Sequence, residues 1–271
     1  MSRARGSLWA LRVAPSTWTG RAVGLGAVVV LVLIWAALTW GEVPERRIIS
    51  PVILPSPMEV VGSVGTLVRE RALLPSIAAT LKRVLLGFGL AALVGVPLGV
   101  LAGSWRVIDA AAAPLAIFGR NIPIAALIPL TILWFGIGET QKVMFIFVAC
   151  MPFVFSDTVR AIVNVPDRYV DTAQTLGASP TQVIRKVLLA LALPEIYGSL
   201  RSLFGLAFGY IMLAELINAG YGLGYLLSTS QRRGLTEHII LILLVIGALA
   251  YGIDRALGWF QRGLFPYRKE G

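Results

Sequence analysis

Long apolar runs separated by shorter polar segments are the dominant pattern along this chain. The first run, residues 22–40, carries no charged residue, and five more are centred near Gly95, Leu127, Phe147, Gly205 and Val245. A helix needs about 20 predominantly apolar residues to cross the hydrocarbon core of a bilayer. The pattern therefore predicts an all-α membrane protein with six transmembrane helices.

The polar segments divide the chain into five parts. We expect a basic cytoplasmic N-terminus over residues 1–21, a first span over 22–40 and an extracytoplasmic segment over 41–79. A five-helix core follows over 80–263, with a polar loop at 165–182, and then a cytoplasmic tail over 264–271. The first run is longer than the apolar stretch of a typical secretory signal and no small-x-small cleavage site follows it, so it predicts a retained span.

The segment over 41–79 is rich in proline, which predicts turns. An amphipathic helix is expected between Met58 and Arg71. Ser56 suits the capping position before this helix, and Pro57 suits its first turn, where a missing N–H costs nothing.

Composition supports a membrane protein and narrows the chemistry. The chain has 271 residues, of which 57% are apolar and 14% charged, against roughly 25% charged in a soluble domain. Its one cysteine, Cys150, excludes an internal disulfide, and its one histidine, His238, excludes a multi-histidine metal site. Cys150 is expected to pack inertly and His238 to lie at the membrane interface.

The net charge of +10 comes mostly from residues that flank apolar runs. This placement favours lipid headgroups over nucleic acid as the partner. With the N-terminus inside, thirteen Lys and Arg residues fall in cytoplasmic segments and nine outside, apart from the intramembrane Arg120 and Arg201. Because positive charge concentrates on the cytoplasmic side, we expect both termini and the polar loop to be inside.

One face of the second span carries only small residues, four apart: Gly87, Ala91, Gly95, Gly99 and Gly103. Such a stripe lets another helix approach closely, because lipid provides no hydrophobic drive for association. Incidental glycine is the alternative, and the strict spacing favours packing. Pro97 and Pro123 are each expected to kink their helices.

The residues of the polar loop predict a short helix, a tight turn and a second helix. Pro166 and Asp167 suit a helix start, and Gly177 suits its end because glycine adopts the left-handed conformation. Tyr169, Ala173 and Leu176 would then share one face. Ser179 to Gln182 forms a capping box that starts the next helix. Spacing alone leaves two interpretations open, a connector lying on the headgroups and a docking site for another protein.

Three ionisable residues fall inside predicted spans, where they are costly and therefore candidates for function. Arg201 and Glu215 are fourteen residues apart, close to four helical turns, and are expected to share a face. They and Arg120 would attract an anion if that face lined a pathway. The alternatives are an internal ion pair, favoured for Glu215, and a guanidinium that reaches the interface for Arg120.

The chain from Leu54 onward resembles permease subunits of ABC importers of the sulfonate, taurine and nitrate group. Each shared phrase is weak, but their order over about 200 residues is specific to the group. The phrases are Leu54-Pro-Ser-Pro57, Arg83-Val-Leu-Leu-Gly-Phe88, Gly95-Val-Pro-Leu-Gly99, Ile122-Pro123, Leu133-Trp-Phe-Gly-Ile-Gly-Glu139, Leu176-Gly-Ala-Ser179, Leu193-Pro194, Leu200-Arg201, Ala214-Glu215 and Gly222-Leu-Gly-Tyr225.

The resemblance implies a type I ABC importer (MetI-like) permease fold and a role for the polar loop. In that family an "EAA" loop forms the coupling helix that fits a partner ATPase. The implied coupling residues are Tyr169, Asp171, Thr172, Ala173, Leu176, Gly177, Ala178 and Ser179. This chain departs from the family pattern at Asp171, usually Glu, at Thr172, usually Ala, and at Ala190, usually Pro. Asn121 replaces a residue that is more often proline, and joins Arg120, Arg201 and Glu215 as a candidate pathway residue.

The resemblance also implies partners and a location. These are two cytoplasmic ATPase subunits that hold ATP and Mg, a second permease copy forming a homodimer, an extracytoplasmic substrate-binding protein, and the bacterial inner membrane. No Gly-x4-Gly-Lys-Ser/Thr loop occurs here, so this chain is expected to bind no cofactor and hydrolyse no ATP. The expected solute is a small anion such as a sulfonate, taurine, nitrate or bicarbonate.

The sequence is also compatible with two other transport functions. An importer for a thiamine-precursor solute and an ion-driven carrier remain as alternatives, although the carrier would leave the polar loop unexplained. An intramembrane enzyme is disfavoured, because the spans hold no paired aspartates and the sequence has no His-Glu-x2-His or Gly-x-Ser-x-Gly motif.

Overall fold

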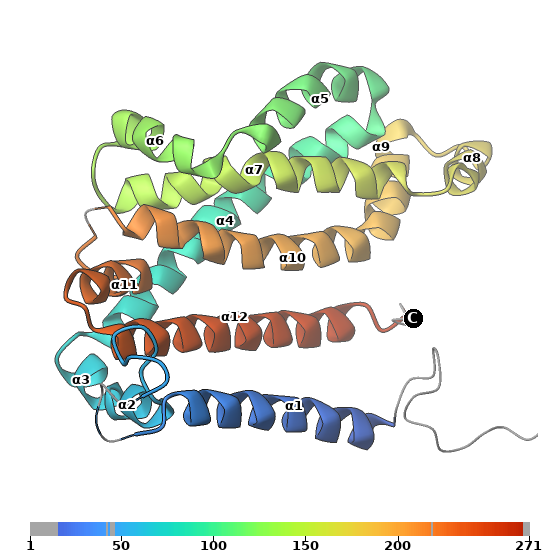
Figure 1. Cartoon of the computed structure of the whole chain (residues 1–271). Helices are drawn as coiled ribbons and strands as arrows, with labels where there is room; N and C mark the ends of the chain where they lie inside the picture. Colours follow the sequence, from blue (N-terminus) through green and yellow to red (C-terminus); the bar gives the residue numbers. More distant parts are fainter. Residues whose placement is uncertain (1–15, 42, 44–46, 218, 268–271) are drawn as a thin grey trace, which may run out of the picture.

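Helices make up every regular element of the described part of the chain, residues 16–41, 43, 47–217 and 219–267 of the computed structural model. Residues 1–15 of the predicted basic N-terminus and residues 268–271 of the predicted tail lie outside the described part. Figure 1 shows the arrangement of the helices. Their bounds are α1 Thr17–Leu38, α2 Pro57–Gly62, α3 Val64–Arg69, α4 Leu73–Ser104, α5 Arg106–Asn121, η2 Ile124–Ala126, α6 Leu127–Phe135, α7 Glu139–Val163, α8 Asp167–Thr175, α9 Pro180–Gln182, η3 Val183–Leu188, α10 Leu189–Glu215, α11 Leu223–Arg232 and α12 Thr236–Leu264.

Among the described residues, five helical stretches are long and apolar enough to cross a membrane: α1, α4, α7, α12 and the run from Pro180 to Glu215. The third predicted span differs from a straight helix. It is divided into α5 and α6, which meet at an angle of 92°. The break follows Asn121, at Ile122-Pro123, because proline has no N–H to donate and disfavours the helical conformation in the residue before it. The described part of the chain has the six predicted spans if this bent pair is counted as one span.

The helix bounds also differ from the expected boundaries near the first two spans. α1 begins at Thr17, before the predicted residue 22, and α4 begins at Leu73, within the segment predicted to end at 79. The amphipathic helix expected over Met58–Arg71 is two short helices, α2 and α3, which meet at Ser63.

The start of α2 has the predicted capping chemistry. The Ser56 hydroxyl accepts from the Glu59 N–H at 3.3 Å, and the Glu59 carboxylate accepts from the Ser56 N–H at 2.7 Å. Partial burial acts to raise the pKa of Glu59, but the Ser56 N–H and Arg47 outweigh it, so the pKa lies below its usual value.

The small-residue stripe of α4 packs directly against α7, as the spacing predicts. A Cβ atom added at Gly99 would lie 2.6 Å from the Thr158 Cβ, and one at Gly103 would lie 2.7 Å from the Ile162 Cβ. Added Cβ atoms at Gly87 and Gly95 would also lie under 3.0 Å from α7 atoms. The two backbones approach this closely only because α4 has no side chains there.

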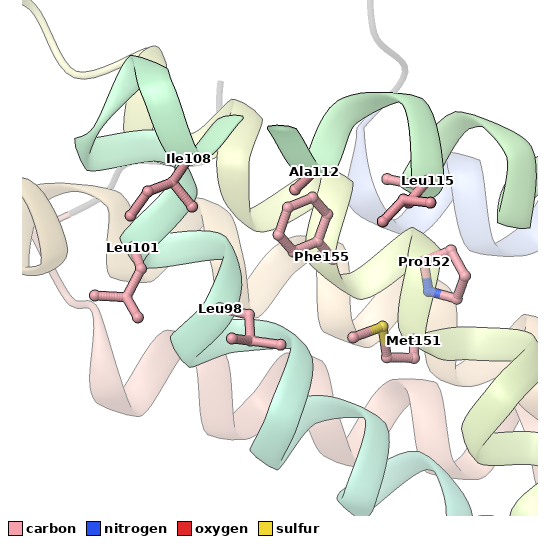
Figure 2. Close-up of a pocket in the computed structure, with 9 residues that line it drawn as sticks. Leu98, Leu101, Ile108, Ala112, Leu115, Met151, Pro152 and Phe155 are labelled. Carbon is pink, nitrogen blue, oxygen red and sulfur yellow. The ribbon is translucent and has the colours of Figure 1, made fainter. Parts of the chain in front are cut away.

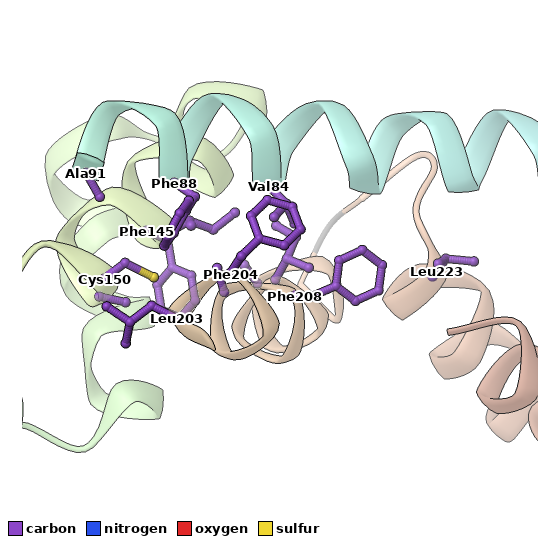
Figure 3. Packing of buried hydrophobic residues seen from close by; sticks show 14 of the residues in the cluster. Val84, Phe88, Ala91, Phe145, Cys150, Leu203, Phe204, Phe208 and Leu223 are labelled. Carbon is purple, nitrogen blue, oxygen red and sulfur yellow. The ribbon is translucent and has the colours of Figure 1, made fainter. Parts of the chain in front are cut away.

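A cluster of buried side chains from α4, α7 and α10 forms the core beside this contact (Figure 3). Phe88 of α4 meets Phe204 of α10 edge to face, with ring centroids 5.4 Å apart. Cys150 is buried in the same cluster, as expected of a packing residue. His238, in the first turn of α12, is buried by neighbouring side chains, and its place at the membrane interface stays a prediction.

The two ends of the bundle differ in what they carry (Figure 1). The start of α1, the end of α12 and helices α8 and α9 lie at one end, whereas α2, α3 and α11 lie at the other. This arrangement agrees with a topology in which both termini and the polar loop are on the same side of the membrane.

The α4–α7 contact generates a direct test. Replacing Gly99 by alanine forces a Cβ atom against Thr158 and the Phe155 carbonyl, and overpacking of this kind costs about 1–3 kcal/mol. Thermal unfolding of the purified protein in detergent should therefore show a lowered midpoint. Gly89→Ala is the matched control on the same helix, because an added Cβ meets nothing within 4 Å there. Equal midpoints for the two variants would contradict close packing at the stripe.

Candidate functional site

The polar loop forms a short helix, α8, that lies outside the bundle (Figure 1). It has Pro166 at its cap and Asp167 in its first turn, as predicted. No α8 residue is buried, Tyr169 is 41% exposed, and Leu176, which directly follows the helix, is 82% exposed. The Arg168 guanidinium lies over the Tyr169 ring, 5.0 Å from its centroid. Tyr169 and Leu176 are therefore not covered by the rest of this chain.

The turn after α8 is fixed by backbone hydrogen bonds. Gly177 has φ of +81°, and its N–H donates to the Gln174 carbonyl at 2.9 Å. The Ala178 N–H donates to the Ala173 carbonyl, also at 2.9 Å. These two bonds are the Schellman arrangement that ends a helix with a left-handed glycine, which confirms the predicted role of Gly177.

A capped turn follows at once. The Gln182 side chain accepts from the Ser179 N–H at 2.8 Å, the Ser179 hydroxyl caps the Gln182 N–H, and Pro180 occupies the first position of α9. Within α8, the hydroxyl of Thr172 donates to the Arg168 carbonyl at 2.6 Å, and Asp171 is exposed. The predicted coupling residues therefore occupy one continuous and locally rigid segment.

A π-helical stretch, η3, joins this segment to α10 and was not predicted. It carries Arg185 and Lys186, and α8 packs against it. At the other end of the loop, the Asn164 side chain donates to Glu195 of α10 at 2.9 Å. α8 is thus connected to α10 by the four-residue turn 176–179, α9 and η3, and it also packs against η3.

At the opposite end of the bundle, Arg83 of α4 forms a buried charge network. Its guanidinium donates to Glu215 of α10 at 2.8 Å and to Glu139 of α7 at 2.7 and 2.5 Å. It also donates to the Tyr221 carbonyl at 2.8 Å. The side chains of Arg83 and Glu215 are 3% and 0% exposed, whereas that of Glu139 is 68% exposed.

The Glu215 carboxylate receives further donors from its surroundings. Thr80 donates to it at 2.8 Å and the Gly224 N–H at 2.9 Å, while the Thr80 hydroxyl itself accepts from the Leu223 N–H. Gly222 has φ of +139°, and a Cβ atom there would lie 2.5 Å from the carboxylate. The Gly222-Leu-Gly-Tyr225 phrase is thus the sequence that lets the chain fold tightly around a buried carboxylate.

Arg201 does not join this network, although it lies on the same helix as Glu215. It forms a bidentate pair with Asp254 of α12, with both distances 2.7 Å, and donates to Gln261 at 3.2 Å. The two residues, expected on one face of the helix, therefore contact different neighbouring helices. For Glu215 the internal ion pair, the favoured alternative, is what the structure has.

Arg120 and Asn121 lie at the end of α5, beside its break from α6. The Arg120 guanidinium is 5.3 Å from the centroid of the Phe153 ring, and the Asn121 side chain donates to the Ile117 carbonyl of its own helix at 2.8 Å. The four candidate pathway residues are thus spread over three places in the protomer.

An apolar hollow of about 280 Å³ lies between α4, α5 and α7 (Figure 2). Its lining residues Leu98, Ile108, Leu115, Met151 and Phe155 offer no charged or hydrogen-bonding side chain to a solute. In the described part of the chain, no cluster of three His, Cys, Asp or Glu residues is arranged to hold a metal ion. The arrangement is that of a membrane scaffold with an external helix.

The family model described as "Binding-protein-dependent transport system inner membrane component" matches residues 95–265. The taurine transport system permease protein TauC of Escherichia coli (strain K12) is 31% identical over 253 residues, which cover 92% of this chain and 90% of that protein. This chain belongs to the family of binding-protein-dependent transport system inner membrane components. The nitrate import permease protein NrtB of Synechocystis sp. (strain PCC 6803) is 30% identical over 250 residues, covering 89% of this permease and 88% of that one.

The fold of the permease also matches a solved structure. A chain from the inward-facing conformations of the MetNI methionine ABC transporter superposes with a TM-score of 0.62 at 24% identity, covering 72% of this chain and 96% of that one. The predicted MetI-like type I fold is therefore confirmed. The chain is a permease, a transport subunit of the inner membrane, and catalysis by ATP hydrolysis belongs to other subunits.

Sequence reasoning missed the partners of the buried charge. By sequence alone Arg83 is one of the nine basic residues predicted outside, and nothing assigns a role to Thr80 or Glu139. A signal was present, because Arg83, Glu139, Glu215 and Gly222 each stand in one of the phrases that carry the family resemblance. The structure shows that these separate phrases meet in one cluster.

The network predicts unequal costs for its two carboxylates. Glu215→Ala removes the buried partner of Arg83 and leaves it only the largely exposed Glu139 carboxylate, and removing one partner of a buried pair costs about 3–5 kcal/mol. Glu139→Ala should cost less, because that side chain is largely exposed and exposed pairs contribute about 0–1 kcal/mol. Unfolding of both variants in detergent measures the difference.

A double variant, Arg83→Met with Glu215→Leu, provides the control for this prediction. It removes both charges together and should recover much of the stability lost in Glu215→Ala. A Glu215→Ala protein as stable as the parent would show that the pair does not hold α4 to α10.

Proposed function

We propose that this permease forms the translocation pathway of an ATP-driven importer for a small oxyanion. In this proposal two copies of the chain form a homodimer and two cytoplasmic ATPase subunits bind beneath it. A substrate-binding protein delivers the solute from the other side. ATP and Mg are held by the ATPase subunits, since this chain has no phosphate-binding loop of its own.

The exposed apolar side chains of α8 are the observation that carries the proposal. Tyr169 protrudes from α8 and Leu176 from the turn after it, where backbone hydrogen bonds end the helix, and a preformed helix loses little conformational entropy when it enters a groove on a partner. The segment from Tyr169 to Ser179, with Asp171, Thr172, Ala173, Gly177 and Ala178, would supply the contact surface for the ATPase.

The proposed coupling is mechanical. ATP binding would close the two ATPase subunits and move the bound α8. Because α8 is joined to α10 through η3, the motion would reach the helices that line the pathway. Nucleotide binding would then favour the outward-open state, and hydrolysis would restore the inward-open one, which is alternating access between two conformations.

The proposed orientation has both termini in the cytoplasm. It is supported by the excess of Lys and Arg in the segments on that side and by the shared position of α8, the start of α1 and the end of α12 (Figure 1). In this orientation α2, α3 and α11 face the binding protein.

Taurine and nitrate, the solutes in the names of the two relatives, share an oxyanion group. Arg120 and Asn121, at the break between α5 and α6, are the residues we assign to the pathway. Broken helices supply such positions in transporters, because irregular backbone in a membrane is tolerated where it lines a cavity. Arg201 and Glu215 are assigned to holding α10 against its neighbours, in agreement with their ion pairs.

Gly177 provides the test of coupling. Gly177→Pro cannot adopt the required φ of +81° and loses the N–H that ends α8, so the ATPase should no longer copurify with an otherwise folded permease. ATP-dependent uptake of taurine and of nitrate into proteoliposomes, with the binding protein present, should fall to background with it.

Gly177→Asn is the matched control, since asparagine tolerates the left-handed conformation and should retain both the ATPase and the uptake. Full uptake by Gly177→Pro would remove the docking role of the loop. Uptake by the parent that needs an ion gradient and no ATPase would instead identify a secondary carrier.

A further inference from the structure

A polar pocket of about 450 Å³ lies at the end of the bundle opposite α8. It is formed where the end of α3 and the start of α4 meet α11, and Figure 1 shows these elements at that end. Its lining mixes charged, hydroxyl and aromatic side chains, unlike the apolar hollow in Figure 2. The lining residues are Glu70, Arg71, Ala72, Ser76, Gly220, Tyr221, Tyr225, Leu226, Thr229 and Arg233.

The charged residues of the pocket leave one positive charge unbalanced. Arg71 and Arg233 contribute two guanidinium groups and Glu70 one carboxylate. None of the ion pairs found among the described residues involves Arg71 or Arg233. A ligand with a single negative charge would therefore balance the pocket, and guanidinium groups suit oxyanions because they donate in a planar fork.

The N-terminus of α4 opens at the same place. Ala72 precedes the helix and Ser76 lies in its first turns, and both line the pocket. No side chain caps this end of the 32-residue helix. Pro75 has no N–H and the Ser76 N–H donates to the Ala72 carbonyl, so the N–H groups of Leu73 and Leu74 are left for an acceptor. A helix N-terminus carries partial positive charge that favours an anion.

Two local features show that the pocket is unusually constrained. The Ser76 side chain is fully buried, and within the described residues its hydroxyl has no hydrogen-bond partner. Ala72 has φ of +53°, a left-handed conformation that is unfavourable for a residue with a Cβ atom. A buried unsatisfied hydroxyl and a strained backbone are both features that recur at ligand sites.

We propose that this pocket binds a singly charged oxyanion group between Arg71, Arg233, the Ser76 hydroxyl and the first N–H groups of α4. The assignment to a transported solute rests on the function proposed above, whereas the binding chemistry rests on the pocket itself. A lipid headgroup phosphate carries the same chemistry. The pocket is distinct from Arg120 and Asn121, which lie on α5.

Its position gives the pocket a route to the buried charge network. Tyr221 lines the pocket, and its carbonyl accepts from Arg83 at 2.8 Å. An oxyanion bound beside Tyr221 therefore lies one residue from the contact that ties α4 to the turn before α11. Occupancy of the pocket would be transmitted to α4 and α10 through that contact.

Saturation-transfer NMR with methanesulfonate tests the pocket on the full-length permease assembled with its ATPase in phosphatidylcholine nanodiscs, without binding protein. Transfer to the methyl protons is expected and should be displaced by nitrate. Arg71→Gln and Arg233→Gln should each weaken binding about tenfold, the loss expected for one charge-assisted hydrogen bond. Ser76→Ala should weaken it as well, with no change in the assembly of the complex.

Arg232→Gln is the matched control, because Arg232 neighbours Arg233 in the sequence and does not line the pocket. Arg232→Gln should bind methanesulfonate with parental affinity. Parental affinity in Arg71→Gln and Arg233→Gln as well would overturn the proposal. Nanodiscs that contain phosphatidylglycerol separate the two sources of the group. Loss of the methanesulfonate signal there identifies a lipid phosphate as the occupant, and an unchanged signal identifies a soluble anion.

Uptake into proteoliposomes with the binding protein, measured beside the nanodisc NMR, keeps this inference separate from the proposed function. ATP-driven uptake without any methanesulfonate signal overturns the pocket and leaves the importer intact. A signal that depends on Arg71 and Arg233, in a protein without ATP-driven uptake, supports the pocket and overturns the importer.

Discussion

The interaction on which the rest of this permease depends is the contact of Arg83 with Glu215 inside the bundle. A buried guanidinium is stable only where every donor finds an acceptor, and here the acceptors come from α7, α10 and the turn before α11. The position of α4 is therefore set relative to three other elements by a single side chain. Gly222 and Gly224 follow from this requirement, since a Cβ atom at Gly222 would collide with the carboxylate and one at Gly224 would collide with α10.

Features set by neighbouring residues could be predicted from the sequence. The end of α8 at Gly177, the capping boxes at Ser56 and Ser179, and the packing face of α4 all depend on spacings of a few residues. Each has one dominant physical cause, such as a left-handed glycine or a missing side chain. The long apolar runs likewise located the spans, because length and polarity decide whether a helix crosses a bilayer.

Features set by distant residues could not be predicted in the same way. Arg83 and Glu215 are 132 positions apart, and nothing local to either states that they touch. The π-helical turn of η3 and the 92° angle between α5 and α6 depend on how these segments pack against the rest of the folded protein. A proline predicts a kink there, but the angle depends on what the two halves meet. The extent of the buried network could not be predicted for the same reason, although Arg83, Glu139 and Glu215 lie in phrases that carry the family resemblance.

The glycine stripe also determines where this protein can bend. Atoms of α7 fill the space left by the missing side chains at Gly87, Gly95, Gly99 and Gly103 of α4, so the two helices cannot slide past one another by a fraction of a turn. The two helices therefore behave as one rigid unit, and any relative movement of helices has to occur elsewhere in the protein. Two interruptions of regular helix, after Asn121 and at η3, lie beside residues that carry the proposed function. One adjoins the loop proposed to dock the ATPase and the other adjoins Arg120, so in the proposed mechanism the docking segment and the assigned pathway would each have a hinge of their own.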